Sequence, residues 1–281
     1  MDEIAKEISK HNKGCTIPGH QEKLGCLLLM DDVALITDKK AEIQELLNIT
    51  QEIASKYHIE FGAEKTKCMV IGSNYKPSLK IGNMEIKTTN KYKYLGEIIQ
   101  DKMSLENNIS ENRGKAEGAL QTILAIAGDP ALKGIQMNTI WKLVETCIVP
   151  IITYGSETWE PTKKEITASN QILDSIIKRI LKVPTSTPRE ALYIETGIID
   201  PDHTRIQKRI AMLHRLNKTK NNLIDKTLKK TSTHAWKPKM EQLMEYINYQ
   251  TPSNEETKNI TNKKAKTSYQ RNLPYQYHKS K

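Results

Sequence analysis

The sequence predicts an α+β protein in which a region of short strands precedes a region of helices. In the first 100 residues, short apolar runs alternate with turn-forming residues, which is typical of strands. After about Asp101, apolar residues recur every three to four positions, which is the spacing of a buried helix face. With 281 residues, the chain has room for one large domain or two small ones. No apolar run approaches the ~18 residues of a membrane-spanning helix, so we expect no contact with a membrane.

Two apolar runs near the start of the chain enclose a pair of acidic residues. Leu24–Leu29 and Val33–Thr37 each have the length of a strand, and Asp31 and Asp32 stand between them. We therefore expect a hairpin with both carboxylates at or beside its turn.

A helix and further strands are expected next. Lys39–Tyr57 has helical spacing, and Asp38 is the expected N-cap because its carboxylate can accept a free N–H of the first turn. Strands are expected at Thr66–Gly72 and Tyr92–Ile99, and between them Leu79–Ile86 contains the two-residue hairpin signal Gly82-Asn83.

Helices should occupy most of the sequence from Asp101 to about residue 217. The first extends to about Ala127, although Gly114 and Gly118 each weaken it by ~1 kcal/mol relative to alanine. The second covers about Ile135–Val149, and Pro150 should end or kink it because proline has no backbone N–H. Two further helices are expected at Glu165–Leu181 and Thr204–Asn217.

Charge is distributed unevenly along the chain. The 43 Lys and Arg residues exceed the 33 Asp and Glu residues by ten, and the net charge is +13 from His203 to Lys281 but −3 before it. Such a basic segment favours a polyanionic partner, most simply nucleic acid. The alternative is a solvated, disordered tail, and Lys263–Lys281, with six basic residues and no acidic one, has that composition. Four scattered cysteines and a charged N-terminus predict a reducing, intracellular compartment, without disulfides or structural zinc.

The acidic pair is the most informative local feature. Two adjacent carboxylates between apolar strands repel each other, and burial increases that cost. A divalent cation relieves the repulsion, and hard oxygen ligands suit Mg²⁺. Taken alone, the pair fits a solvated turn better than a metal site, so the rest of the sequence has to decide between the two.

The segment Leu27–Ile36 (LLLMDDVALI) resembles the metal-binding motif of reverse transcriptases from non-LTR (LINE-type) retrotransposons, where Tyr/Phe-Ala-Asp-Asp precedes a short apolar strand. Five further segments resemble elements of this family and occur in the family's order. They are Glu64–Lys67 (EKTK) with the strand Cys68–Ile71, the primer-grip strand Tyr92–Gly96 (YKYLG), the first thumb helix Arg113–Ala119 (RGKAEGA), Tyr154–Trp159 (YGSETW) and Ser186–Leu192 (STPREAL). The resemblance covers about residues 25–216.

The resemblance implies a partial polymerase palm, a small antiparallel sheet with a helix, over residues 1–100. It implies an α-helical thumb over residues 101–217 and a basic, disordered tail over residues 218–281. The implied chemistry is phosphoryl transfer with Mg²⁺, in which Asp31 and Asp32 bind the metal. Lys65, with Lys67 as the alternative, would donate a proton to the leaving group.

The sequence departs from the family at the implied catalytic centre. The family uses three carboxylates, and no strand–Asp segment that could supply the third precedes Asp31. Leu29 replaces the aromatic residue of the motif, and Met30 replaces its small alanine. Because positioning and charge stabilisation supply most of the catalysis of phosphoryl transfer, we expect this chain not to polymerise alone.

Contacts with template and primer are also implied. The candidate nucleic-acid-binding residues are Tyr94, Gly96, Arg113, Lys115, Arg205, Lys208 and Arg209. The last three are spaced i, i+3, i+4, which predicts one basic stripe on a helix. Further candidates are Lys178, Arg179, Lys182 and Arg189, and in the tail Tyr269, Tyr275 and Tyr277 with Arg271 and Lys279, an arrangement that permits base stacking. Two functions stay open: a fragment of an RNA-directed DNA polymerase, or a non-catalytic nucleic-acid-binding or interaction protein derived from one.

Overall fold

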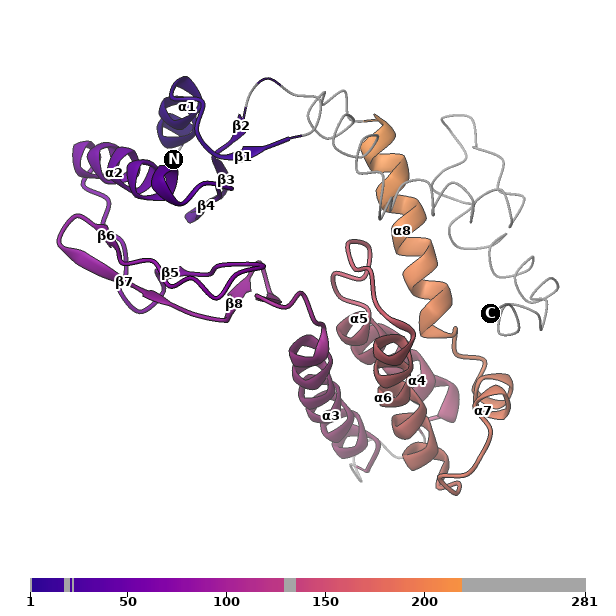
Figure 1. Cartoon of the computed structure of the whole chain (residues 1–281). Helices are drawn as coiled ribbons and strands as arrows, with labels where there is room; N and C mark the ends of the chain where they lie inside the picture. Colours follow the sequence, from indigo (N-terminus) through magenta and orange to yellow (C-terminus); the bar gives the residue numbers. More distant parts are fainter. Residues whose placement is uncertain (1, 18–20, 22, 129–134, 219–281) are drawn as a thin grey trace.

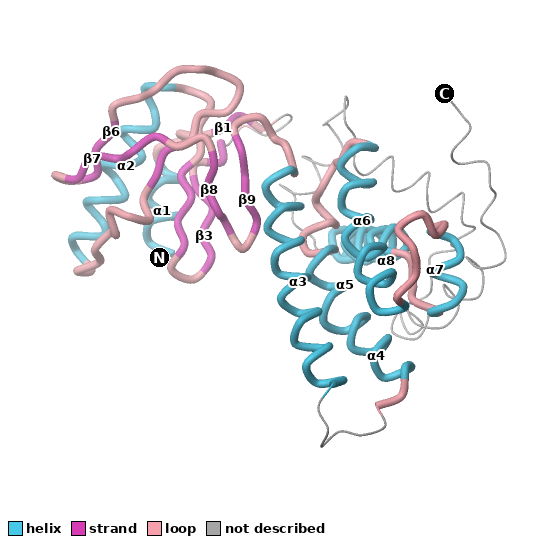
Figure 2. Tube along the Cα trace, turned by 90° about the horizontal axis from the view of Figure 1, so that it is seen from below, coloured by secondary structure: helices cyan, strands magenta, loops and turns pink. Residues whose placement is uncertain are grey.

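The computed structural model describes residues 2–17, 21, 23–128 and 135–218 (Figure 1). Strands and helices are both present, so the predicted α+β class is confirmed. The elements form two lobes, seen side by side in Figure 2: a strand lobe, residues 2–100, and a helical lobe, residues 106–218. Within these described ranges, no helix is both long and apolar enough to cross a membrane. The predictions for the tail beyond Lys218, including those for its tyrosines, lie outside the described residues.

The strand lobe begins with elements that the sequence patterns did not predict. Helix α1 (Asp2–Lys10) packs against α2 (Lys40–Lys56) through a small apolar cluster, and β1 (Cys15–Thr16) pairs with β2 (Lys23–Leu24). The expected strand Leu24–Leu29 is interrupted at Gly25. A side chain there would collide with the Lys13 carbonyl and with Ile8 of α1, so close packing of this helix accounts for the glycine.

The predicted acidic hairpin is confirmed. Strands β3 (Cys26–Leu29) and β4 (Asp32–Leu35) pair antiparallel, with Leu29 opposite Asp32. The helix expected after them is also present, but the prediction that Asp38 caps it was wrong: Lys39 is the N-cap residue and provides no side-chain cap. The Asp38 carboxylate instead accepts the backbone N–H of Thr16 at 3.1 Å, which ties β1 to the start of α2.

Three of the remaining strands form one small sheet over α2. β6 (Leu79–Ile81) and β7 (Met84–Thr88) turn at Gly82-Asn83 as predicted, and their apolar side chains pack on Leu47. Of the expected strand Thr66–Gly72, only β5 (Lys67–Cys68) forms, parallel to β7.

Tyr92–Ile99 was expected to be one strand, and that prediction was wrong. The segment is a hairpin of β8 (Lys91–Tyr94) and β9 (Glu97–Gln100). Its turn consists of Leu95 and Gly96, which have φ values of 50° and 86°. Positive φ at both central residues gives the strand twist that a two-residue hairpin requires.

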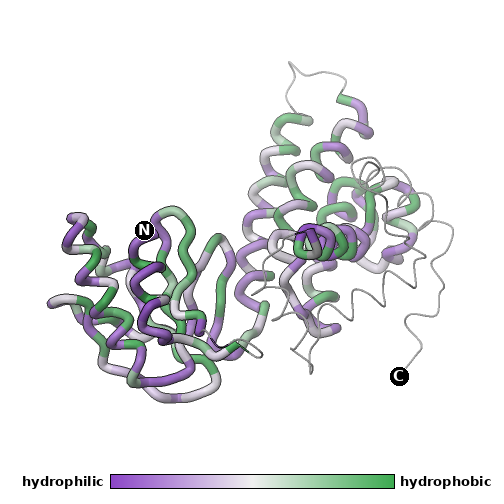
Figure 3. The backbone as a smooth tube through the Cα atoms, turned by 90° about the horizontal axis from the view of Figure 1, so that it is seen from above, coloured by the Kyte–Doolittle hydropathy of each residue, from purple (hydrophilic) through white to green (hydrophobic). Residues whose placement is uncertain are grey.

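The helical lobe has the largest apolar core of the described residues. Its elements are α3 (Glu106–Gly128), α4 (Met137–Leu143), the π-helical segment η2 (Val144–Ile148), α5 (Val149–Ile152), α6 (Lys163–Leu181), α7 (Arg189–Thr196) and α8 (Pro201–Lys218). Hydrophobic and hydrophilic stretches alternate along these helices in Figure 3, as expected for helices that each bury one face. Ile172, Leu173, Ile176 and Ile177 of α6 are all at most 1% exposed and lie at the centre of this core.

Pro150 was expected to end or kink its helix, and it does not end it. The backbone widens into η2 directly before the proline, and helical structure continues to Ile152. A π-helical turn is a common way to accommodate a disturbed hydrogen-bond ladder. Helix α6 begins at a capping box, in which Thr162 and Glu165 each accept the other's backbone N–H.

Candidate functional site

The acidic pair stands at the tip of the β3–β4 hairpin. Met30 and Asp31 form the two-residue turn, and Asp32 is the first residue of β4; both carboxylates are exposed. Met30 has a φ of 54° and is 86% exposed, so its side chain extends into solvent from a backbone conformation that costs ~1–2 kcal/mol for a residue with a Cβ.

These two carboxylates do not make a complete two-metal centre. Oxygen ligands of this kind suit Mg²⁺, but two ions bridged for phosphoryl transfer need further carboxylates. In the part of the chain that the structure describes, no three His, Cys, Asp or Glu side chains gather as metal ligands. The described residues therefore do not fit the implied metal site, and no catalytic step can be assigned to it.

Tyr94 of the β8–β9 hairpin lies close enough to the acidic tip for the charge of Asp32 to act on its phenol. Burial raises the pKa of the Tyr94 phenol, and the nearby negative charge of Asp32 raises it further. The Tyr92 hydroxyl of the same strand donates a hydrogen bond to the Lys65 carbonyl at 3.0 Å. The Lys65 side chain is exposed. The sequence segments around Asp31, Lys65 and Tyr92 are therefore neighbours in the fold.

The turn of the β8–β9 hairpin is held by the segment that follows α5. The Tyr154 hydroxyl donates to the Leu95 carbonyl at 2.8 Å, and a side chain on Gly96 would stand only 3.0 Å from that hydroxyl. Gly96 was predicted to contact nucleic acid, but its positive φ and this close approach of Tyr154 already explain the glycine.

A second contact lies on the other side of this turn. The Trp159 indole N–H donates to the Glu97 carboxylate, and burial raises the pKa of Glu97 against the effect of that bond. Gly155 has a φ of 67°, and a side chain there would collide with Glu97. The two motifs YKYLG and YGSETW, identified separately in the sequence, thus meet in one contact region between the lobes, which we call the junction: residues 94–97 and 153–159.

Arg205, Lys208 and Arg209, which were predicted to form a basic stripe that contacts nucleic acid, donate to acceptors within the protein. The three do share one face of α8, but this face is turned inward. Lys208 Nζ donates to the Thr153 carbonyl at 2.6 Å, and Arg209 donates to the carbonyls of Ser156 and Trp159. These two cations therefore hold the junction segment in place.

Arg205 is only 6% exposed and binds within the helical lobe. Its guanidinium donates to Asn170 at 2.6 Å, to Asp202 at 2.5 Å and to Ser169 at 2.7 Å. Helical periodicity shows that residues share a face, but not whether that face is buried, and here the acceptors come from distant parts of the chain.

The cations of the other helices are divided between occupied and exposed groups. Lys115 pairs with Glu111 at 2.7 Å, which Lys93 also contacts, and Arg179 pairs with Glu117. The others with fixed partners are Lys178, which donates to the Thr185 carbonyl, and Arg189, which pairs with Asp174 and Asp200.

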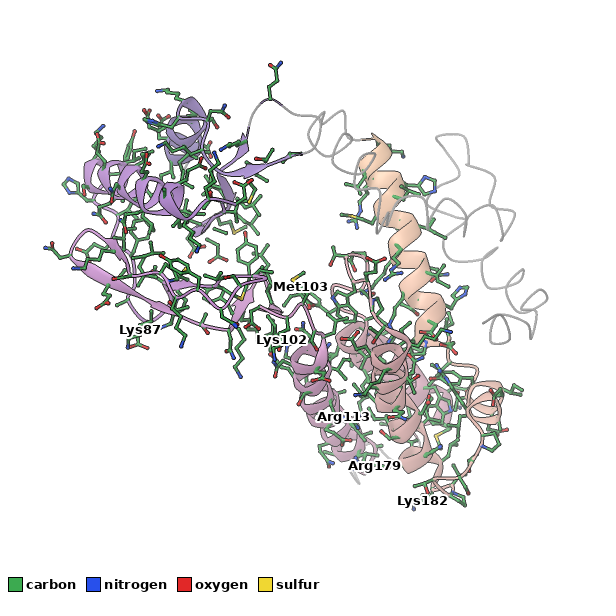
Figure 4. All side chains as sticks on the ribbon, viewed as in Figure 1. Lys87, Lys102, Met103, Arg113, Arg179 and Lys182 are labelled. Atoms are coloured by element: carbon green, nitrogen blue, oxygen red, sulfur yellow. The ribbon has the colours of Figure 1, made fainter. Side chains whose placement is uncertain are left out.

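Arg113 and Lys182 are exposed, and no acidic side chain among the described residues pairs with either. In Figure 4 the labelled basic residues follow one edge of the molecule, from Lys87 on β7 through Lys102 and Arg113 to Arg179 and Lys182. This edge is the candidate surface for a polyanion.

Sequence reasoning missed Glu97 and Tyr154 as site residues. Glu97 carries no signal of its own, because one acidic residue after a turn is common on any surface. Tyr154 belongs to a motif that the resemblance had marked, and that motif was the available signal. Only the fold shows that its hydroxyl reaches a residue 59 positions earlier in the chain.

No protein-family model, no curated protein and no solved structure matches this chain. The likeness to LINE-type reverse transcriptases therefore rests on the sequence motifs alone, and what it implies about activity is a matter for proposal and experiment.

Proposed function

We propose that this chain is a palm and thumb portion of a LINE-type reverse transcriptase that holds nucleic acid but does not polymerise by itself. One observation carries the proposal: three motif segments that resemble this family contact one another in series. The segment at Lys65 contacts Tyr92, and the turn after Tyr94 contacts Tyr154, across the two lobes. Motifs that came together only by chance in the sequence would not be expected to form a connected set.

Catalysis by this chain is disfavoured by its acidic tip. Two exposed carboxylates from a single turn, without a third ligand among the described residues, leave a two-metal centre open. Positioning and charge stabilisation supply most of the rate of phosphoryl transfer, so an incomplete centre should lose orders of magnitude. Binding of nucleic acid does not require a complete metal centre, since phosphate contacts need only accessible cations.

A primer-extension assay tests the absence of catalysis. The full chain is incubated with an RNA template, a DNA primer, deoxynucleotides and Mg²⁺, and we expect no elongation. Elongation that Asp31→Ala abolishes would overturn the non-catalytic part of the proposal. Elongation that persists in Asp31→Ala would come from a contaminating polymerase and would leave the expectation in place.

A binding assay tests the other half. Fluorescence anisotropy with a labelled RNA–DNA hybrid should show an affinity that falls linearly with salt on logarithmic axes. Arg113→Ala and Lys182→Ala should each reduce that slope by about one, because each removes one phosphate contact. Lys56→Ala is the matched control, since it removes the same charge from α2, where Lys56 pairs with Glu52. Binding without salt dependence, or an equal effect of Lys56→Ala, would refute the assignment.

A further inference from the structure

The segment that carries Tyr154 is held in place by several hydrogen bonds. Thr153 and Ser156 are completely buried, and the Ser156 hydroxyl donates to the Thr153 carbonyl at 2.8 Å. Thr158 closes the next turn with a bond of 2.9 Å to the Gly155 carbonyl. From α8, Lys208 and Arg209 bind carbonyls of the same segment. Its backbone is therefore fixed from both sides.

Tyr154 itself is not a core residue. It is 49% exposed, so burial of apolar surface explains only part of its presence. Its hydroxyl reaches across to the other lobe and binds the Leu95 carbonyl at 2.8 Å. A phenol that is half exposed and aimed at one backbone oxygen is better explained by that contact than by packing.

The Leu95–Gly96 turn has an unfavourable backbone conformation that other residues must stabilise. Leu95 has a φ of 50°, in the left-handed region that costs ~1–2 kcal/mol for a residue with a Cβ. Such conformations persist where the surroundings determine them. Here Tyr154 holds Leu95, and the Trp159–Glu97 hydrogen bond holds the residue that follows Gly96.

A movement of this turn would also move Tyr94. Tyr94 directly precedes the turn, and its phenol lies in the electric field of Asp32. The chain of contacts therefore runs from α8 through the 153–159 segment to the Leu95–Gly96 turn, which Tyr94 directly precedes.

We propose that Tyr154 is a positioning residue: by its hydrogen bond to Leu95 it fixes the turn of the β8–β9 hairpin and so the position of Tyr94 at the end of β8. This inference deepens the proposed function and rests on it, because it makes the geometry of the strand lobe, which carries the primer-grip-like segment, depend on a residue of the helical lobe.

The test variant is Tyr154→Phe, which removes the hydroxyl and keeps the ring. The matched control is Tyr92→Phe, because the Tyr92 hydroxyl also donates to a backbone carbonyl from the same hairpin, but on Lys65. Protein labelled with ¹³C at leucine carbonyls and ¹⁵N at glycine gives two Leu–Gly signals, since only Gly25 and Gly96 follow leucine. Leu24→Ile removes the Gly25 signal and so identifies the other.

We expect Tyr154→Phe to shift the Leu95 carbonyl and Gly96 amide signals while the Gly25 signal stays in place. Tyr92→Phe should leave both signals nearly unchanged. An unshifted Leu95–Gly96 signal in Tyr154→Phe would overturn the proposal, and so would an equal shift in Tyr92→Phe.

Binding of the RNA–DNA hybrid provides the functional readout. The Tyr154–Leu95 hydrogen bond is intramolecular, so its loss weakens the affinity only by displacing the turn. The loss in Tyr154→Phe should therefore not exceed the worth of one neutral hydrogen bond, about ten-fold, and the salt slope should not change because no phosphate contact is lost. A reduced salt slope would mean that Tyr154 contacts phosphate directly, and would overturn the positioning role. If the unaltered chain does not bind the hybrid, the proposed function fails, while the Leu95–Gly96 signal still decides whether Tyr154 positions the turn.

Discussion

Replacing Arg205 with alanine should destabilise the helical lobe without weakening nucleic-acid binding. The guanidinium makes three hydrogen bonds, to Asn170, Asp202 and Ser169. Asp202 is partly solvated and keeps a 2.9 Å bond from Asn170, so its loss is small. The Asn170 and Ser169 side chains are 2% and 4% exposed, so their oxygens would lose a partner where water cannot replace it.

The size of the effect follows from these two acceptors. Each buried oxygen left without a donor costs about 1–3 kcal/mol, so the two together cost about 2–6 kcal/mol. We therefore expect Arg205→Ala to lower the free energy of unfolding by about 2–6 kcal/mol. Arg205→Lys should not restore it, because one ammonium cannot reproduce the geometry of a planar guanidinium.

Urea unfolding followed by circular dichroism measures this change. Arg113→Ala is the control, and as an exposed substitution it should stay within about 0.5 kcal/mol of the unaltered chain. The two variants should behave oppositely in the hybrid-binding assay, where Arg113→Ala lowers the salt slope and Arg205→Ala does not. A loss below about 1 kcal/mol for Arg205→Ala, or a reduced salt slope for it, would refute the reasoning.

Three further predictions concern other parts of the fold. The pKa of Glu42 is lowered to about 2, chiefly by a hydrogen bond from Lys23. The stabilisation that the Glu42 carboxylate provides is therefore complete above its ordinary pKa of 4.5 and is lost as the pH falls towards 2. Glu42→Gln should flatten the pH dependence of urea unfolding in that window, and an unchanged curve would contradict this. Gly114→Ala and Gly118→Ala should each stabilise the chain by up to ~1 kcal/mol, because both positions open to empty space on α3, and thermal unfolding that shows destabilisation would argue against it. Met30→Gly should stabilise the acidic hairpin by ~0.5–1 kcal/mol by relieving its positive φ, a gain that urea unfolding would detect and that a loss of stability would disprove.

Local patterns predicted the elements whose causes are local. The acidic hairpin and the Gly82-Asn83 turn follow from turn residues between apolar runs, and the α6 helix follows from its apolar spacing. The turn at Leu95-Gly96 was missed because leucine rarely adopts a positive φ, so the segment had the pattern of one continuous strand. What supports leucine in that conformation comes from Tyr154, which no local pattern can show.

For the candidate site, too, the sequence predicted the local features but not the contacts between distant segments. Asp31 and Asp32 stand at a hairpin tip, as expected, but the nearness of Tyr94 to that tip depends on how two hairpins pack. The acceptors of the basic residues of α8 also lie in distant parts of the chain, so the sequence could not show them. Asp38 shows the effect on a smaller scale, because a backbone N–H 22 residues earlier competes successfully with the helix terminus for its carboxylate.

The chemistry of the junction has a consequence for how its sequence can change during evolution. Tyr154, Lys208 and Arg209 all donate to backbone carbonyls, those of Leu95, Thr153, Ser156 and Trp159. Every residue type has such a carbonyl, so substitution at an accepting position leaves the acceptor intact. In a set of homologues, Tyr154 should therefore vary less than the position of Leu95, whose side chain is 43% exposed, and these two residues need not covary.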